Sequence, residues 1–262
     1  MRNSLPALLA AGLAMAAPAS AATLVGLTAD NQLVRIDTES HAASAPVMVR
    51  GVEGRLLGID VRPADGRLYG VTEGGQIVTL DAATGQATAV SRLSETFESG
   101  GRAVVDFNPA ADRLRLMGMG GVNFRIHPDT GAVTRDGTLK YQPGPYGETA
   151  PRIVAGAYTN SVAGTQSTAL YTIDTLLRRL NLQAPPNDGV QQPKGEIAAS
   201  LPAGVAFDIL STGQGGGAPA NTAWLLAGGT LHTISLETGA ATPLGAVARL
   251  PQAEILDIAA MP

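Results

Sequence analysis

The chain has 262 residues, no cysteine and a formal net charge of −4 at neutral pH. Without cysteine it has no disulfide, no thiolate metal ligand and no thiol nucleophile. The mildly acidic balance argues against nucleic acid or an anionic membrane surface as the partner.

Residues 1–21 have the organisation of a secretory signal peptide. Arg2 supplies the positive start, 5–17 is an apolar run too short to span a membrane, and Ala19-Ser20-Ala21 is a small-residue cleavage site. We therefore predict a signal peptide over 1–21, and an exported protein that is periplasmic or extracellular. Residues 22–262 are predicted to form a single domain, and we expect no transmembrane segment after cleavage because no later apolar run reaches membrane length.

A short phrase recurs along the remaining sequence: an apolar residue, two variable residues, a second apolar residue, and then Asp, Asn, His or Ser. The five copies end at Asp37, Asp81, His127, Asn181 and Ser235. The second apolar residues lie at positions 36, 80, 126, 180 and 234, so the steps are 44, 46, 54 and 54 residues. A strand-rich repeat of this length is typical of a β-propeller.

Each copy is interpreted as four short strands separated by Gly, Pro and Asp turns. In the clearest copy the strands are expected over 56–61, 67–71, 76–80 and 86–93. The first strand recurs at 103–107, 153–158, 205–209 and 255–258, and the second at 24–27, 114–117, 170–173 and 224–227. Two late copies carry insertions, 159–168 and 211–222, which lengthen the turn between the first and second strands and explain the two longer steps.

The two ends of the sequence complement each other. The part after residue 21 begins at a second strand, and the last segment, 254–260, is a first strand. Joining them completes a fifth copy, so we predict an all-β, five-bladed propeller whose last blade is closed by the N- and C-terminal strands and leaves no open edge. The alternative is a β-sandwich, which needs no such repeat.

Several markers in fixed order resemble those of a known family. They are 58–63, 106–115, 123–131, 157–160 and 185–189. The series resembles an exported bacterial family catalogued as domain of unknown function 4394, over essentially the whole chain after the signal peptide. The resemblance implies an exported repeat protein, and it implies no catalytic residue and no mechanism.

The best candidate site is a set of acids at one repeated position of the first strand. Its members are Asp60, Asp106, Asp208 and Asp257, and Ala157 stands at the fifth position. First strands line the central channel of a propeller. Four converging carboxylates could bind a hard cation such as calcium, which is the one cofactor that the pattern suggests.

The alternative role of these acids is structural, and it is the one that we favour. A buried carboxylate needs hydrogen bonds or an opposite charge. Each Asp could accept backbone N–H groups of the next blade, or pair with an arginine such as Arg62, Arg113 or Arg125.

A second candidate site lies in the third copy, which is more polar than the others. Asn123, Arg125 and Arg113 are its candidate ligand-binding residues, because Arg can bind a carboxylate or phosphate through two hydrogen bonds. The alternative is a salt-bridge network between blades.

No nucleophile elbow and no zinc-binding His-Glu-x-x-His helix is present in the sequence. The first functional hypothesis is therefore a non-enzymatic binding or scaffold protein of the bacterial envelope, whose partner is a protein, a peptide or a glycan. The second is a metal-assisted, calcium-type hydrolase or lyase with its site at the central channel. The third is a structural envelope component without a small ligand.

Overall fold

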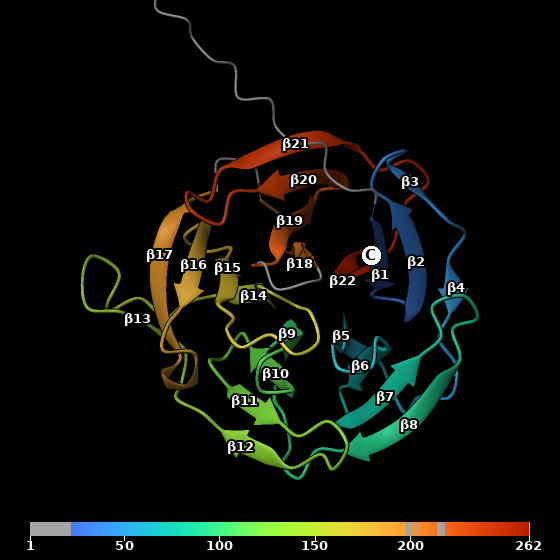
Figure 1. Ribbon diagram of the computed structural model, residues 1–262, viewed down its shortest axis with the longest axis horizontal. Coiled ribbons are helices and arrows are strands. Elements are labelled where there is room, and N and C mark those ends of the chain that lie inside the picture. The colour runs from blue at the N-terminus through green and yellow to red at the C-terminus, as the bar shows by residue number, and fades with distance from the viewer. Residues whose placement is uncertain (1–21, 198–200, 203, 214–217, 262) are drawn as a thin grey trace, which may run out of the picture.

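The computed structural model describes residues 22–197, 201–202, 204–213 and 218–261. The predicted signal peptide, 1–21, lies outside the described residues. The chain forms five small sheets arranged in a ring, a five-bladed β-propeller (Figure 1). The predicted fold class is thus confirmed.

We number the blades I to V in chain order and give their strands from the inside of the ring outward. Blade I contains β22 (Ile255–Met261), β1 (Thr23–Thr28), β2 (Gln32–Asp37), β3 (Ala42–Ala43) and β4 (Val47–Met48), the last two both paired with β2. Blade II contains β5 (Leu56–Val61), β6 (Leu68–Thr72), β7 (Gln76–Leu80) and β8 (Ala87–Arg92). Blade III contains β9 (Ala103–Asn108), β10 (Arg113–Gly118), β11 (Asn123–Ile126) and β12 (Val133–Arg135).

Blade IV contains β14 (Ile153–Tyr158), β15 (Leu170–Asp174), β16 (Arg179–Gln183) and β17 (Val190–Glu196). The short strand β13 (Lys140–Tyr141) pairs in parallel with β17 at the outer edge, and a 3-10 turn, Pro186–Asp188, precedes β17. Blade V contains β18 (Ala206–Thr212), β19 (Ala220–Ala227), β20 (Thr230–Ile234) and β21 (Ala241–Ala246).

The ring is closed within blade I by strands from both ends of the described chain. β22 pairs antiparallel with β1, with Ala260 opposite Leu24 and Ile258 opposite Gly26. This pairing confirms the predicted joint blade. It leaves every inner strand next to another inner strand around the channel (Figure 1).

The hydrophobic core lies between neighbouring blades, which explains the burial pattern of the strands. Every residue of β6 is buried, because both of its faces meet another blade, whereas the outermost strand β21 is largely exposed. Tyr69 of blade II packs edge-on against Phe107 of blade III, with ring centroids 5.3 Å apart. Each such ring removes roughly 150–250 Å² of surface from water, so the junctions between blades carry most of the stabilisation.

The described part of the chain contains no helix of the length and apolar character needed to cross a membrane.

Candidate functional site

The four acids of the first-strand position connect the blades to one another. In each case one carboxylate oxygen accepts the backbone N–H of the next inner strand. The donors and N···O distances are Phe107 to Asp60 at 2.6 Å, Tyr158 to Asp106 at 2.9 Å, Ala260 to Asp208 at 2.6 Å and Ile59 to Asp257 at 2.9 Å. The acids therefore bridge four of the five blade junctions, and blade IV has Ala157 at this position.

One of the four carboxylates differs from the others. The second oxygens of Asp60, Asp208 and Asp257 accept the N–H of the residue that follows each of them, at 2.6, 2.5 and 3.0 Å. Asp106 accepts through Oδ1 alone, and its Oδ2 has no hydrogen-bond donor among the described residues. Asp106 thus keeps one free acceptor oxygen.

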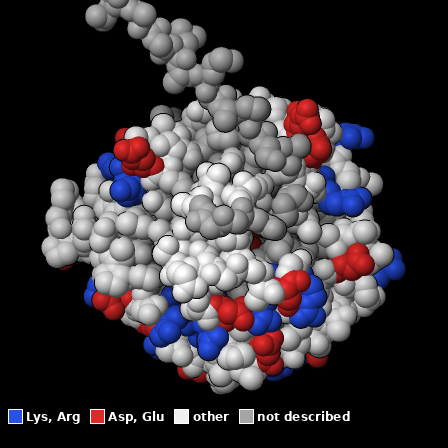
Figure 2. All heavy atoms as spheres, in the orientation of Figure 1, with Lys and Arg blue, Asp and Glu red and all other residues white. Residues whose placement is uncertain are grey.

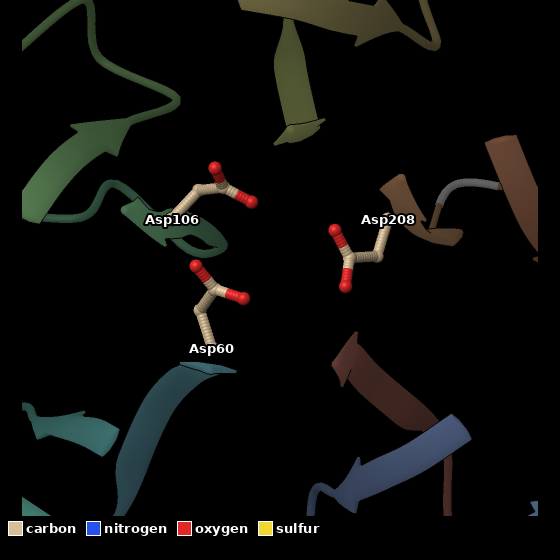
Figure 3. A group of neighbouring side chains, drawn as sticks. All are labelled: Asp60, Asp106 and Asp208. Carbon is tan, nitrogen blue, oxygen red and sulfur yellow. The ribbon is translucent and has the colours of Figure 1, made fainter. Parts of the chain in front are cut away.

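Three of the four acids come together in the channel. Asp60, Asp106 and Asp208 each place one carboxylate oxygen within 4.8 Å of the other two, and the three side chains face a common space (Figure 3). Asp257 does not belong to this group, and the Arg102 guanidinium offsets its charge. The predicted four-acid ring is therefore a three-acid cluster, and we call Asp60, Asp106 and Asp208 the channel triad.

The environment of the triad disfavours its charged form. Burial raises the pKa of Asp60 and of Asp106 well above the ordinary range, and the negative charge of neighbouring triad members adds to the rise. Burial also raises the pKa of Asp208 to about 6, although backbone N–H bonds partly offset the effect. A cation placed among these groups would favour their charged form, because it offsets the cost of burying each carboxylate and reduces the repulsion between them.

The arginines suggested as partners of these acids pair elsewhere, which corrects that part of the sequence interpretation. Arg62 binds Asp112 at 2.6 Å and Asp129 at 2.8 Å, both in blade III. Arg125 binds Asp136 at 2.8 Å, and Arg113 donates to backbone carbonyls. Among the described residues, no hydrogen bond or ion pair joins any of these three arginines to the four acids.

The second candidate set, Asn123, Arg125 and Arg113, is not one site. Asn123 is buried and accepts a hydrogen bond from Arg115 at 2.8 Å. Asp136 joins Arg115 to Arg125. The same buried guanidinium of Arg115 also donates to Tyr158 and Asn187 of the next segment, so this network ties blade III to blade IV. Arg113 is not part of it.

An open cavity of about 1060 Å³ lies at the mouth of the channel. Asp60 and Asp208 line it together with the ends of the inner strands. Its wall is completed by the loop 161–166, which extends toward the centre of the ring (Figure 1), and by the end of β18 with Gly213. Among the described lining residues there is no Lys, Arg or His. On the same face charged side chains gather toward the rim (Figure 2).

The loop of blade IV is fixed to strands β18 and β19 of blade V by side-chain hydrogen bonds. Asn221 donates to Asn160 Oδ1 at 2.9 Å and accepts the N–H of Asn160 at 2.8 Å. Ser211 joins the pair, donating to Asn221 at 2.7 Å and accepting from Ser161 at 2.8 Å. The hydrogen bonds connect blades IV and V, the junction that has no bridging Asp.

The opposite end of the channel carries an arginine. All five inner strands run toward the cavity, so residues just before them lie at the far end. Arg102 precedes β9 and reaches across to the carbonyls of Val205 at 2.7 Å and Leu256 at 2.6 Å, and to Glu254 at 2.8 Å. It therefore links blades III, V and I there, and the cavity opens at the other end.

Sequence reasoning missed the cavity-lining residues of the loop 161–166, such as Ser161, Thr165 and Gln166. The insertions were recognised only as an explanation of the longer repeat steps. A usable signal was present: both insertions fall in the same turn of adjacent repeats, and that position places them on the same rim of a propeller.

The chain belongs to the family described as domain of unknown function (DUF4394), whose sequence profile matches residues 32–259. No curated protein matches the sequence. Among solved structures, an auxiliary nutrient binding protein from Bacteroides ovatus is 14% identical with a TM-score of 0.40, over 62% of this chain and 44% of that protein. This chain thus spans less than half of that neighbour's length.

Two further solved structures show a similar degree of likeness. A protein of unknown function from Bacteroides caccae is 10% identical with a TM-score of 0.45, over 86% of this chain and 73% of that protein. The computationally designed protein Ika8 is 12% identical with a TM-score of 0.37, over 89% of this chain and 61% of that protein.

Proposed function

We propose that this protein is an exported, non-enzymatic binding protein whose ligand enters the cavity at the mouth of the central channel. The observation that carries the proposal is the cavity itself, walled by a loop of blade IV that is bonded to blade V above a pair of buried carboxylates. Small-molecule sites commonly have volumes of about 300–1,000 Å³. The cavity therefore suits a small molecule, a short glycan or the end of a peptide.

The scaffold supports such a role because it holds the loop in place. Binding residues are often carried by loops that a rigid framework positions. Here the framework is a closed ring, and the Asn160–Asn221 pair fixes the blade IV loop to β19 of blade V. A site that is ordered before binding loses less conformational entropy when the ligand enters.

The test is a thermal-shift screen of small molecules, oligosaccharides and short peptides, because a ligand of the native state raises the melting temperature. Each compound that does so is then tested on Val162→Trp, which fills the cavity wall, and on Leu176→Trp, a control on an exposed turn of blade IV. Loss of the shift in the first variant alone supports the proposal. Equal shifts in both variants would place the ligand elsewhere.

Export is part of the proposal and rests on the pattern of residues 1–21. Expression of the full chain in a bacterium with a general secretion system should yield a mature N-terminus at Ala22 outside the cytoplasm. Recovery of uncleaved chain in the cytoplasm alone would contradict it.

A second candidate function is a calcium-assisted hydrolase or lyase, and the convergence of three carboxylate oxygens within 4.8 Å favours it. A bound Ca²⁺ would supply Lewis-acid polarisation of a substrate oxygen. Melting the protein with excess chelator and then with added Ca²⁺ tests this candidate. A calcium-dependent rise that disappears in Asp106→Asn supports it, and unchanged melting contradicts it.

A further inference from the structure

We infer that the ligand of the cavity carries a primary ammonium group, and that the channel triad of Asp60, Asp106 and Asp208 holds this group at the base of the cavity. The inference rests on the proposed binding function and gives the chemical class of the ligand.

The charge of the triad has no partner in the described chain. None of the ion pairs formed by the described residues includes a member of the triad, although all three side chains are buried. A buried carboxyl group without a cation is held in its neutral form by a raised pKa, and a bound cation favours the charged form instead. The described cavity lining offers no basic side chain, so the structure itself supplies no positive charge there. A ligand cation would supply it, and an anionic ligand would be repelled.

A second observation, independent of the number of acids, concerns hydrogen bonding. Asp106 is only 3% exposed, and its Oδ2 accepts no hydrogen bond from the described residues. This oxygen is not one of the side-chain atoms that are fully buried without a partner, so a donor that enters the channel can reach it. Its carboxylate faces the space that the triad encloses (Figure 3), so such a donor would lie in that space.

The number of converging oxygens favours an ammonium group over a bare metal ion. Calcium takes about 6–8 oxygen ligands. The triad brings three carboxylate oxygens, one from each residue, within 4.8 Å of one another. A primary ammonium needs only three acceptors. Three oxygens lying within 4.8 Å of one another can each accept one of its N–H bonds.

The remaining lining describes the body of the ligand. Ser161, Thr165 and Gln166 present hydroxyl and amide groups, and Ile209 and Leu210 add apolar surface. Such a lining suits a neutral, polar body of several carbon atoms. A metal ion alone would leave most of a cavity of about 1060 Å³ unfilled. An amine-bearing organic molecule uses both the triad and the cavity.

The experiment measures binding to the whole mature protein by calorimetry, using matched compounds. Glucosamine, 1,5-diaminopentane and a lysine-ended tripeptide are each compared with their N-acetylated forms, beside a general panel of neutral and anionic compounds and Ca²⁺. Asp106→Asn removes the free oxygen but can keep the bond from Tyr158. Asp188→Asn, on the exposed 3-10 turn of blade IV, is the matched loss of one charge.

We expect at least one amine to bind, its N-acetylated form to bind at least tenfold more weakly, and Asp106→Asn to lose at least tenfold in affinity while Asp188→Asn loses none. Cooperative melting of Asp106→Asn shows that the variant is folded. Binding of neutral or anionic compounds without any amine preference overturns the inference and leaves the proposed function intact. Binding of Ca²⁺ alone overturns it in favour of the metal site, and no binding by any compound overturns both.

Discussion

Replacing Asp106 and Asp60 separately with Asn should have unequal effects on stability, although both acids are buried in the same cluster. Asp106 uses one oxygen, so the amide oxygen of Asn can accept the Tyr158 N–H and the new NH₂ group takes the place of the free Oδ2. Asp60 uses both oxygens, for Phe107 and for Val61. In Asp60→Asn one of these N–H donors must face the NH₂ group.

The expected magnitudes follow from these contacts. An unsatisfied buried N–H costs about 1–3 kcal/mol. Both substitutions remove a buried carboxyl whose pKa is raised by burial and by the charges of neighbouring acids, so this effect is common to the two variants. We therefore expect Asp106→Asn to be more stable than Asp60→Asn by about 1–3 kcal/mol, and at least as stable as the parent.

Urea denaturation at pH 7 measures both variants, with an unchanged m-value as the sign that the unfolding transition is comparable. Circular dichroism reports the loss of the sheets. Equal destabilisation by the two substitutions would refute the reasoning, because the unpaired oxygen of Asp106 would then not make its replacement less costly than that of Asp60.

Three other changes test the architecture. Burial raises the pKa of Asp208 to about 6 from 3.8, so between these values the folded protein binds a proton that the unfolded chain releases. The free energy of unfolding should therefore fall by about 3 kcal/mol from this group as the pH rises from about 4 to above 6. A urea midpoint that is higher at pH 6.5 than at pH 4.5 would contradict this expectation. A Cβ added at Gly58 would lie 2.7 Å from both Asp257 Oδ2 and Val105 Cγ2, so Gly58→Ala should cost about 1–3 kcal/mol while Gly120→Ala, whose Cβ meets nothing within 4 Å, should not. Deleting residues 254–262 removes β22, and with it the pairing to β1 and the Ala260 donor to Asp208, so the truncated chain should lose its cooperative melting transition; a truncation that melts like the parent would contradict the closure.

The sequence predicted the propeller because each blade repeats the same physical requirements. Every blade needs apolar residues on both faces of its middle strands and turn residues between the strands. Because this requirement is the same in each blade, it produces a periodic pattern that is visible in a single sequence. The split blade followed from strand order alone, since 24–27 and 254–260 are the two missing members of one copy. The observed pairing of β1 with β22 agrees.

The candidate site was predictable only in part. The repeated Asp position could be placed on the inner strands, because strand order around a channel is a property of the fold. Which acids converge depends on side-chain geometry, and Asp257 lies beside Arg102, a residue 155 positions earlier in the numbering. The pairing of Arg62 with Asp112 and Asp129 depends on how two turns of adjacent blades meet. The Asn160–Asn221 contact likewise joins a loop of blade IV to a strand of blade V, which no local sequence pattern connects.

The most direct test of the account is a crystal structure of the mature protein with an amine-bearing compound selected by calorimetry. We expect the compound in the cavity at the channel mouth, between the loop 161–166 and the end of β18, with its nitrogen within hydrogen-bonding distance of Asp106 Oδ2. A compound bound on the outer strands, or one that leaves the Asp106 carboxylate without a new partner, would contradict it.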